Sequence, residues 1–175
     1  MDSLVNGNVW RVLFGYWEVR VLVEYRKATV EDIDLVAKIR LEFLSEVNNI
    51  NNDDEKFQLH ESIRHYMSCA IADESFVSWL AIENEEVVAI SGVSFYTLPP
   101  NKKCLNGKVA YISNMYTYPS HRNRGIASKL FDLTVKEAKK RDCTKISLNA
   151  TDMGRSLYEK YGFTDTVNDM VYYTC

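Results

Sequence analysis

The sequence is poor in glycine and proline, with seven and three among its 175 residues, and it contains no internal repeat. A collagen-like or low-complexity chain is therefore excluded. Hydrophobic residues make up 46% and charged residues 26%, a balance typical of a chain that folds around its own core. At this length we expect one domain that needs neither disulfides nor a structural metal.

Metal-binding residues are also scarce. The four cysteines are far apart in the chain: Cys69, Cys104, Cys143 and Cys175. They form no C-x-x-C pair, which argues against a zinc site or a disulfide framework and favours reduced thiols in a cytoplasmic protein. His60 and His65 are five residues apart, whereas the helix of a zinc protease needs histidines four apart on one face. We therefore expect no metal.

Positive charge is not in excess, because the formal net charge is -3. Such a chain has no long-range field that would attract a polyanion, so we expect no nucleic-acid partner. A cationic amine as substrate suits this charge balance better.

No apolar run is long enough to span a bilayer. Val9–Val23 is apolar and aromatic, but Arg11, Glu18 and Arg20 interrupt it, and it has no secretory cleavage site. We expect no membrane contact. At and just beyond its end, four residues alternate with mostly polar neighbours: Val19, Val21, Val23 and Tyr25. Residues 1–23 are therefore predicted to be an N-terminal extension or an extra edge strand, and a candidate contact in a homodimer.

Residues 24–175 are predicted to form one mixed α/β domain. Thr29 and Asp32 form a capping box that opens a helix, and the face of a second strong helix begins at Ile126. The predicted elements in chain order are a strand ending at Tyr25–Ala28, a helix from Thr29 to Val47, a helix Asp54–Ile71, strands Phe76–Ile82, Val87–Tyr96 and Val109–Thr117, a helix from Ile126, a strand Lys145–Ala150, a short helix Gly154–Tyr161, and a closing hairpin of Phe163–Val167 with Met170–Thr174. This order favours a largely antiparallel sheet flanked by helices.

The segment from Asn114 to Ala127 carries the chemistry. A strand ends at Pro119, and the chain turns at Gly125 into the strong helix. A strand, a tight turn and a helix start direct unpaired backbone N–H groups and the positive end of the helix at one point. That point suits a pyrophosphate, because Gly125 has no side chain in the way and Ala127 keeps the first helical turn slim.

Two motifs resemble the GNAT superfamily of acyl-CoA-dependent N-acetyltransferases. Arg122, Gly125 and Ala127 match its signature of Gln or Arg, two residues, Gly, one residue, then Gly or Ala. About thirty residues later Leu157–Phe163 reads LYEKYGF, similar to the short helix that bears a catalytic tyrosine in this superfamily, here Tyr158.

The resemblance implies the GNAT fold, a mixed and mostly antiparallel twisted sheet whose central strands splay apart. It implies acetyl-CoA as cosubstrate, with the pantetheine arm between the strand of Met115 and the strand of Asn149. The residues implied in cofactor binding are Met115, Tyr116, Thr117, Arg122, Asn123, Arg124, Gly125, Ile126, Ala127 and Asn149. A backbone N–H near Met115 would polarise the acetyl carbonyl, an amine would attack it directly, and Tyr158 would protonate the departing thiolate.

The general base is the one part of the pattern that is missing. Many relatives carry a glutamate early in the strand before the phosphate loop, where this chain has Tyr111. Glu42, Glu46 and Asp169 lie in regions that line the acceptor site in the superfamily, and each is also compatible with a solvated surface charge.

Two alternatives stay open at this point. The missing carboxylate keeps a non-catalytic acyl-CoA sensor of the same fold possible. A nucleotide-binding protein would use the same helix start, but Arg122–Ala127 lacks the Lys-Ser or Lys-Thr ending of a P-loop. The acceptor, a small molecule or a peptide amine, depends on loops whose sequence carries no motif.

Overall fold

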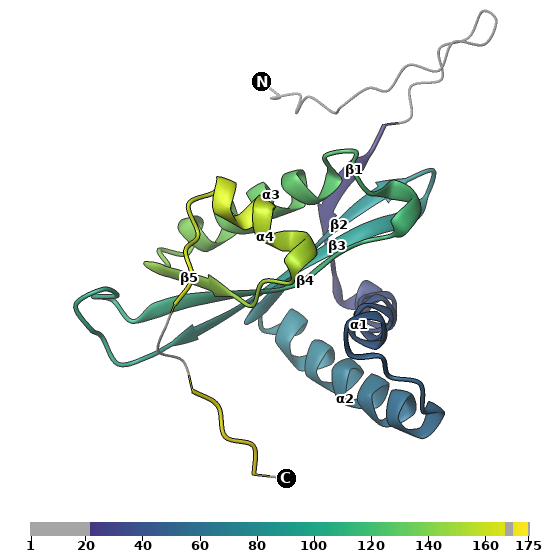
Figure 1. Cartoon of the computed structure of the whole chain (residues 1–175), viewed down its shortest axis with the longest axis horizontal. Helices are drawn as coiled ribbons and strands as arrows, with labels where there is room; N and C mark the ends of the chain where they lie inside the picture. Colours follow the sequence, from purple (N-terminus) through teal and green to yellow (C-terminus); the bar gives the residue numbers. More distant parts are fainter. Residues whose placement is uncertain (1–21, 167–169, 175) are drawn as a thin grey trace, which may run out of the picture.

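A computed structural model describes residues 22–166 and 170–174 and contains one five-stranded sheet (Figure 1). The strands lie in the order β1-β2-β3-β4-β5. Neighbours β1 to β4 pair antiparallel, and β4 pairs parallel with β5. The strands are β1 Glu24–Lys27, β2 Phe76–Glu83, β3 Glu86–Thr97, β4 Lys108–Thr117 and β5 Lys145–Leu148. The predicted mixed, mostly antiparallel class is confirmed.

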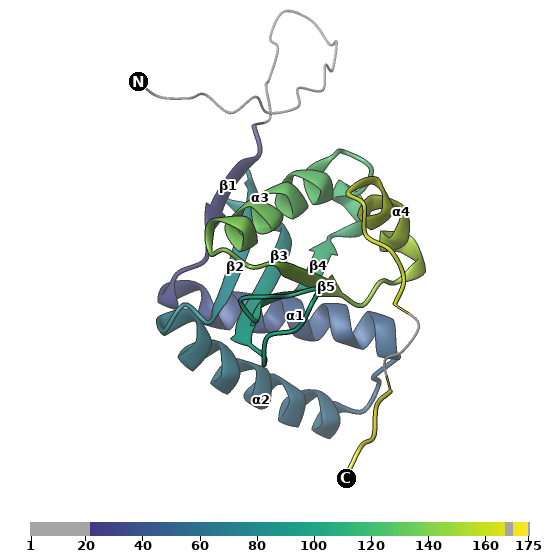
Figure 2. The ribbon, with the colours of Figure 1, turned by 90° about the vertical axis from the view of Figure 1, so that its left-hand side faces the viewer.

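Four helices cover the two faces of this sheet. The helices are α1 Ile33–Asn48, α2 Asp53–Ala72, α3 Ile126–Lys140 and α4 Asp152–Lys160, with short 3-10 turns at Val30–Asp32 and Pro119–His121. Figures 1 and 2 show α1 and α2 on one face and α3 with α4 on the other. Each face has its own core: Ile39, Met67 and Leu80 belong to the first, and Val93 and Phe131 to the second.

The predicted capping box fixes the start of the first helical layer. The Asp32 carboxylate accepts the Thr29 N–H at 2.8 Å, and Thr29 Oγ1 accepts the N–H of Glu31 at 3.3 Å. Arg26 of β1 donates to the same carboxylate at 2.7 Å. This hydrogen bond is the largest cause that lowers the pKa of Asp32 to about 2. The box therefore caps the 3-10 turn Val30–Asp32 that leads into α1, and Arg26 ties this turn to β1.

Strands β4 and β5 part halfway along β4. Their pairing ends at Ile112 with Leu148, whereas β4 continues to Thr117. Just beyond this point Asn114 has a left-handed backbone, with φ of 55°, and the register with β3 shifts. A bulge of this kind bends the strand away from its neighbour. The splayed central strands implied by the resemblance are therefore present.

The predicted closing hairpin is wrong for the part of the chain that the structure describes. Residues 163–166 and 170–174 form no strand, and the side chain of Tyr172 is 87% exposed. Alternating residues form a strand only where a sheet edge offers a ladder to join. Here Phe163 packs on Phe131 instead, with ring centroids 5.6 Å apart.

The N-terminal prediction lies almost wholly outside the described residues, which begin at Leu22. Within them, the edge strand of the sheet is β1, which pairs with β2 from Glu24 opposite Ile82 to Lys27 opposite Trp79. Searching the same described stretch finds no helix both long and apolar enough for a membrane crossing.

Candidate cofactor site

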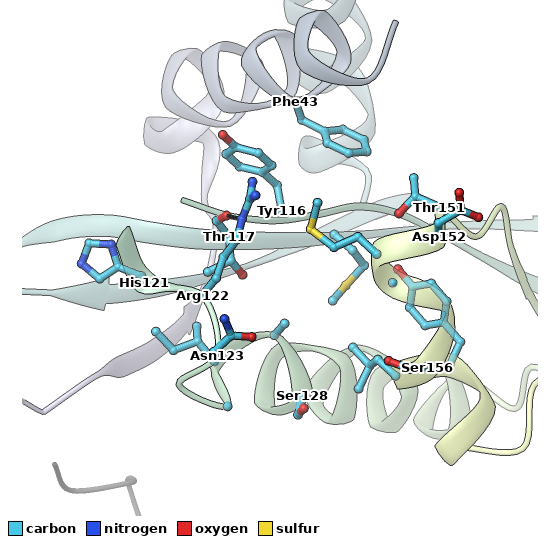
Figure 3. A pocket seen from close by; sticks show the side chains of 18 of the residues that line it. Phe43, Tyr116, Thr117, His121, Arg122, Asn123, Ser128, Thr151, Asp152 and Ser156 are labelled. Carbon is cyan, nitrogen blue, oxygen red and sulfur yellow. Dashed lines mark hydrogen bonds between the residues drawn. The ribbon is translucent and has the colours of Figure 1, made fainter. Parts of the chain in front are cut away.

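A cavity of about 710 Å³ opens where β4 and β5 part. Its walls come from four helices and strands and from the loop before α3. Met115, Tyr116 and Thr117 come from β4, His121 to Asn123 from the loop apart from their neighbour Arg124, Gly125 to Ser128 from the start of α3, Thr151 to Gly154 and Ser156 to Tyr158 from α4, and Phe43, Glu46 and Val47 from the end of α1. Figure 3 shows Phe43 and Tyr116 on the α1 side of the cavity, opposite Asn123 and Ser128.

Main-chain N–H groups at the start of α3 have no acceptor among the described residues. They belong to six consecutive residues: Asn123, Arg124, Gly125, Ile126, Ala127 and Ser128. Asn123 and Gly125 have left-handed backbones, with φ of 61° and 78°, so the chain curls around a concave row of donors. Together with the positive end of a 15-residue helix, this row forms an anion site.

The two arginines of this loop have different surroundings. Arg122 lines the cavity, where its Nε donates to the Thr117 carbonyl at 2.9 Å and its Nη2 lies 3.3 Å from Glu46. Arg124 does not line the cavity, because its guanidinium makes two hydrogen bonds to the Glu83 carboxylate. Of the two predicted cofactor contacts, Arg122 thus lines the cavity, whereas Arg124 does not.

Glu83 anchors the loop to the β2–β3 hairpin. Its side chain is 7% exposed, accepts from Arg124, and lies 3.2 Å from Nε2 of His121. The hydrogen bond from Arg124 is the main cause that lowers the pKa of the Glu83 carboxyl. His121 and Arg124, on either side of Arg122, therefore both contact the Glu83 carboxylate, which holds the loop in its curved conformation.

We expect the change Glu83→Gln to weaken CoA binding about 5-fold, equivalent to about 1 kcal/mol, because the loop loses its charged anchor. It should also lower the free energy of unfolding by about 1 to 3 kcal/mol at pH 7. Since the folded pKa of Glu83 is lowered, this stabilisation is present at neutral pH and is lost as the pH falls through that pKa. Urea unfolding at several pH values measures it.

The matched control is Glu86→Gln, which changes an exposed carboxylate of the same hairpin. Equal CoA affinity in the two variants would show that the anchor does not shape the loop.

Tyr158 lies at the α4 wall of the cavity and is buried against Phe131, with ring centroids 5.2 Å apart. Its hydroxyl has no hydrogen-bond partner among the described residues, and burial raises its pKa. Gly154 makes room for the ring, because a Cβ there would lie 2.9 Å from the Tyr158 hydroxyl oxygen. The Tyr158 hydroxyl therefore stays protonated at neutral pH and can donate its proton.

The structure brings together most of the residues singled out from the sequence. Those that line the cavity are Met115, Tyr116, Thr117, Arg122, Asn123, Gly125, Ile126, Ala127 and Tyr158. Asn149 does not, because β5 ends at Leu148 and Asn149 is exposed beyond it, so the predicted strand Lys145–Ala150 is two residues too long. Phe43, Ser128 and Gly154 also line the cavity and were not predicted from the sequence. Only Ser128 could have been found from nearby residues, because it lies in the first turn of α3.

The candidate bases differ in position. Glu46 lines the cavity and pairs with Arg122, whereas Glu42 accepts a hydrogen bond from the Tyr118 hydroxyl at 2.6 Å. Asp169 lies outside the described residues. A further carboxylate, Asp152 at the start of α4, lines the cavity and was not predicted.

With this geometry in place, the chain can be compared with known proteins. The family model described as Acetyltransferase (GNAT) family matches residues 39–163. The chain belongs to the GNAT acetyltransferase family. No curated protein matches its sequence.

Several solved structures are similar to the whole domain. A predicted acetyltransferase from Clostridium acetobutylicum, solved with acetyl-CoA, is 35% identical, with a TM-score of 0.80 over 87% of this chain and 96% of that one. A GCN5-related N-acetyltransferase from Ralstonia eutropha JMP134 is 27% identical, with a TM-score of 0.79 over 87% and 99%. Glucosamine-6-phosphate N-acetyltransferase from Arabidopsis thaliana, 20% identical with a TM-score of 0.60 over 87% and 99%, shares the fold.

Proposed function

We propose that the protein transfers the acetyl group of acetyl-CoA to a primary amine by direct attack in a ternary complex. The observation that carries the proposal is the row of unpaired N–H groups from Asn123 to Ser128 at one end of the cavity. A diphosphate bound there leaves the pantetheine arm to run toward the gap between β4 and β5. The similar Clostridium structure with acetyl-CoA supports the same ligand.

The pantetheine arm is the part of the cofactor that the parted strands fit. Beyond Ile112, β4 has no strand partner on its β5 side within the described residues. Amides of the arm can pair with this free edge as a short added strand would. The thioester then lies near the Asn114 bulge, where a backbone N–H of Met115 or Tyr116 can polarise the acetyl carbonyl.

In the reaction the amine nitrogen attacks the acetyl carbon, and the carbon–sulfur bond breaks. The sulfur takes the proton of the Tyr158 hydroxyl, and the amine gives up its own proton to water or a carboxylate of the cavity. Binding both substrates at once supplies much of the acceleration, because it replaces a bimolecular encounter by a positioned one. The acceptor is a small molecule or a peptide amine.

The proposal is tested by following thiol release from acetyl-CoA with a panel of amines and peptides, together with the melting temperature in the presence of acetyl-CoA. Thiol release that depends on an amine supports it. A raised melting temperature without release for any amine would instead identify a sensor of acyl-CoA.

For Tyr158→Phe we expect kcat to fall about 100-fold or more, because the departing thiolate loses its proton donor. The affinity for acetyl-CoA should stay within about 2-fold, since the ring and its packing are kept. Steady-state kinetics and calorimetric titration measure the two quantities.

Tyr161→Phe is the control, because Tyr161 follows α4 directly and also contacts Phe131, edge to face with ring centroids 4.8 Å apart. Its kcat should be unchanged. Equal kcat in both variants would reduce Tyr158 to a packing residue.

A further inference from the structure

Arg40 has an unusual environment for a cation. It projects from α1 and donates to the side-chain oxygen of Asn114, the bulge residue of β4. It is partly buried, and burial lowers the pKa of its guanidinium. The tyrosines Tyr66 of α2 and Tyr111 of β4 lie close enough to interact with its charge.

Among the described arginines, only Arg40 has no carboxylate within ion-pair distance. The others pair as Arg26 with Asp32, Arg64 with Asp34, Arg122 with Glu46, Arg124 with Glu83, Arg141 with Glu74 and Glu137, and Arg155 with Asp165. A cation withdrawn from water normally has a counter-charge, because its desolvation is otherwise uncompensated. Within residues 22–166 and 170–174, no carboxylate therefore balances the charge of Arg40.

Asn114 supplies a second, independent observation. Its side chain is 1% exposed, and its Nδ2 amide group has no hydrogen-bond partner among the described residues. Because Arg40 is a donor only, it fixes the side-chain oxygen toward itself and leaves the NH2 group as an unused donor. Buried donors of this kind are rarely left without an acceptor. The amide NH2 thus lacks an acceptor, and the guanidinium beside it lacks a counter-charge, among the described residues; one carboxylate would supply both.

The position of this pair relates it to the reaction. Met115, the residue after Asn114, lines the cavity, and so does Phe43, one helical turn after Arg40. Phe43 in turn contacts Tyr116, with ring centroids 5.9 Å apart. Arg40 and Asn114 therefore meet at the bulge, next to residues that line the cavity, although neither lines it.

We propose that Arg40 and Asn114 bind a carboxylate carried by the acceptor, so that the substrate is an amine with an amino-acid-like anionic group. This rests on the proposed acetyl transfer. A carboxylate fits better than a phosphate, because one guanidinium beside one amide matches a planar monoanion with two oxygens. The hydroxyl of Tyr66, 3.1 Å from Ser94 Oγ, adds a neutral polar group to the same face.

The test compares matched pairs, namely common amino acids and their carboxamides, as acceptors in the thiol-release assay. We expect kcat/KM to be about 10-fold or more higher for the acids. In Arg40→Met this ratio should fall to about one while the affinity for acetyl-CoA is unchanged. The control Lys38→Met removes an exposed cation from the same helix, 68% exposed, and should keep the ratio.

A second measurement applies whether or not the panel contains the natural acceptor. The melting temperature is recorded with CoA and an N-acetyl amino acid, and again with CoA and the matching N-acetyl amide. The acid should raise it more than the amide in the wild-type protein, and the two should be equal in Arg40→Met.

Equal responses to acid and amide in the wild-type protein, or no response to either, would overturn the carboxylate site. So would a preference for the acid that persists in Arg40→Met. Failure of the acetyl-transfer proposal looks different, because no amine would then cause thiol release from acetyl-CoA in the wild-type protein.

Discussion

The change Gly125→Glu should abolish the rise in melting temperature that acetyl-CoA causes. At a ligand concentration of 100 times Kd, binding stabilises a folded protein by about 2.7 kcal/mol, which is about 5 to 10 °C for a domain of this size. Gly125 has a φ of 78° in the middle of the unpaired N–H groups. A glutamate there strains the backbone and puts a carboxylate where the diphosphate must approach. Differential scanning fluorimetry with and without acetyl-CoA measures the effect.

The control for this variant is Gly162→Glu. Gly162 also has a left-handed backbone, with φ of 85°, and a Cβ there would meet no atom within 4 Å. The two substitutions thus share the backbone penalty and the added charge, but only one lies at the cavity. Gly162→Glu should keep the full response to acetyl-CoA. A normal response in Gly125→Glu would remove the α3 loop from the binding site.

Phe131→Ala should lower the free energy of unfolding by about 3 to 5 kcal/mol, as removal of a buried phenyl ring leaves a cavity. Phe131 is fully buried and contacts the rings of Tyr158, Tyr161 and Phe163. These contacts hold α4 against α3. Urea denaturation measures the loss of stability, and the same variant should transfer acetyl groups more slowly because Tyr158 loses its support.

Phe57→Ala serves as the control for this change, because Phe57 on α2 is 67% exposed. Its stability should stay within about 0.5 kcal/mol of wild type. A similarly small loss for Phe131→Ala would mean that the aromatic cluster does not hold α4 in place.

Features set by neighbouring residues were predictable from the sequence. The capping box at Thr29 and Asp32 gives the start of the first helical layer, and both hydrogen bonds are present. The apolar spacing after Ile126 gives α3, and the turn at Gly125 before it gives the unpaired donors. These signals are local because capping and amphipathic periodicity act within a few residues.

Features set by distant residues were not predictable. Arg124 and Glu83 are 41 positions apart, so the loop sequence alone could not show that this guanidinium is used by the protein itself. Arg40 and Asn114 meet across 74 positions for the same reason. The closing hairpin of 163–167 with 170–174 was predicted from the order of the elements, and that order does not say whether a sheet edge is available for pairing.

The most direct test of the account follows the amide ¹H–¹⁵N shifts of Gly125, Ile126 and Ala127 during a titration with CoA and, separately, with pantetheine, which lacks the diphosphate. We expect large downfield shifts of these three amides with CoA and small ones with pantetheine, because the N–H groups donate to the diphosphate. CoA binding that leaves the three amides unmoved would contradict it.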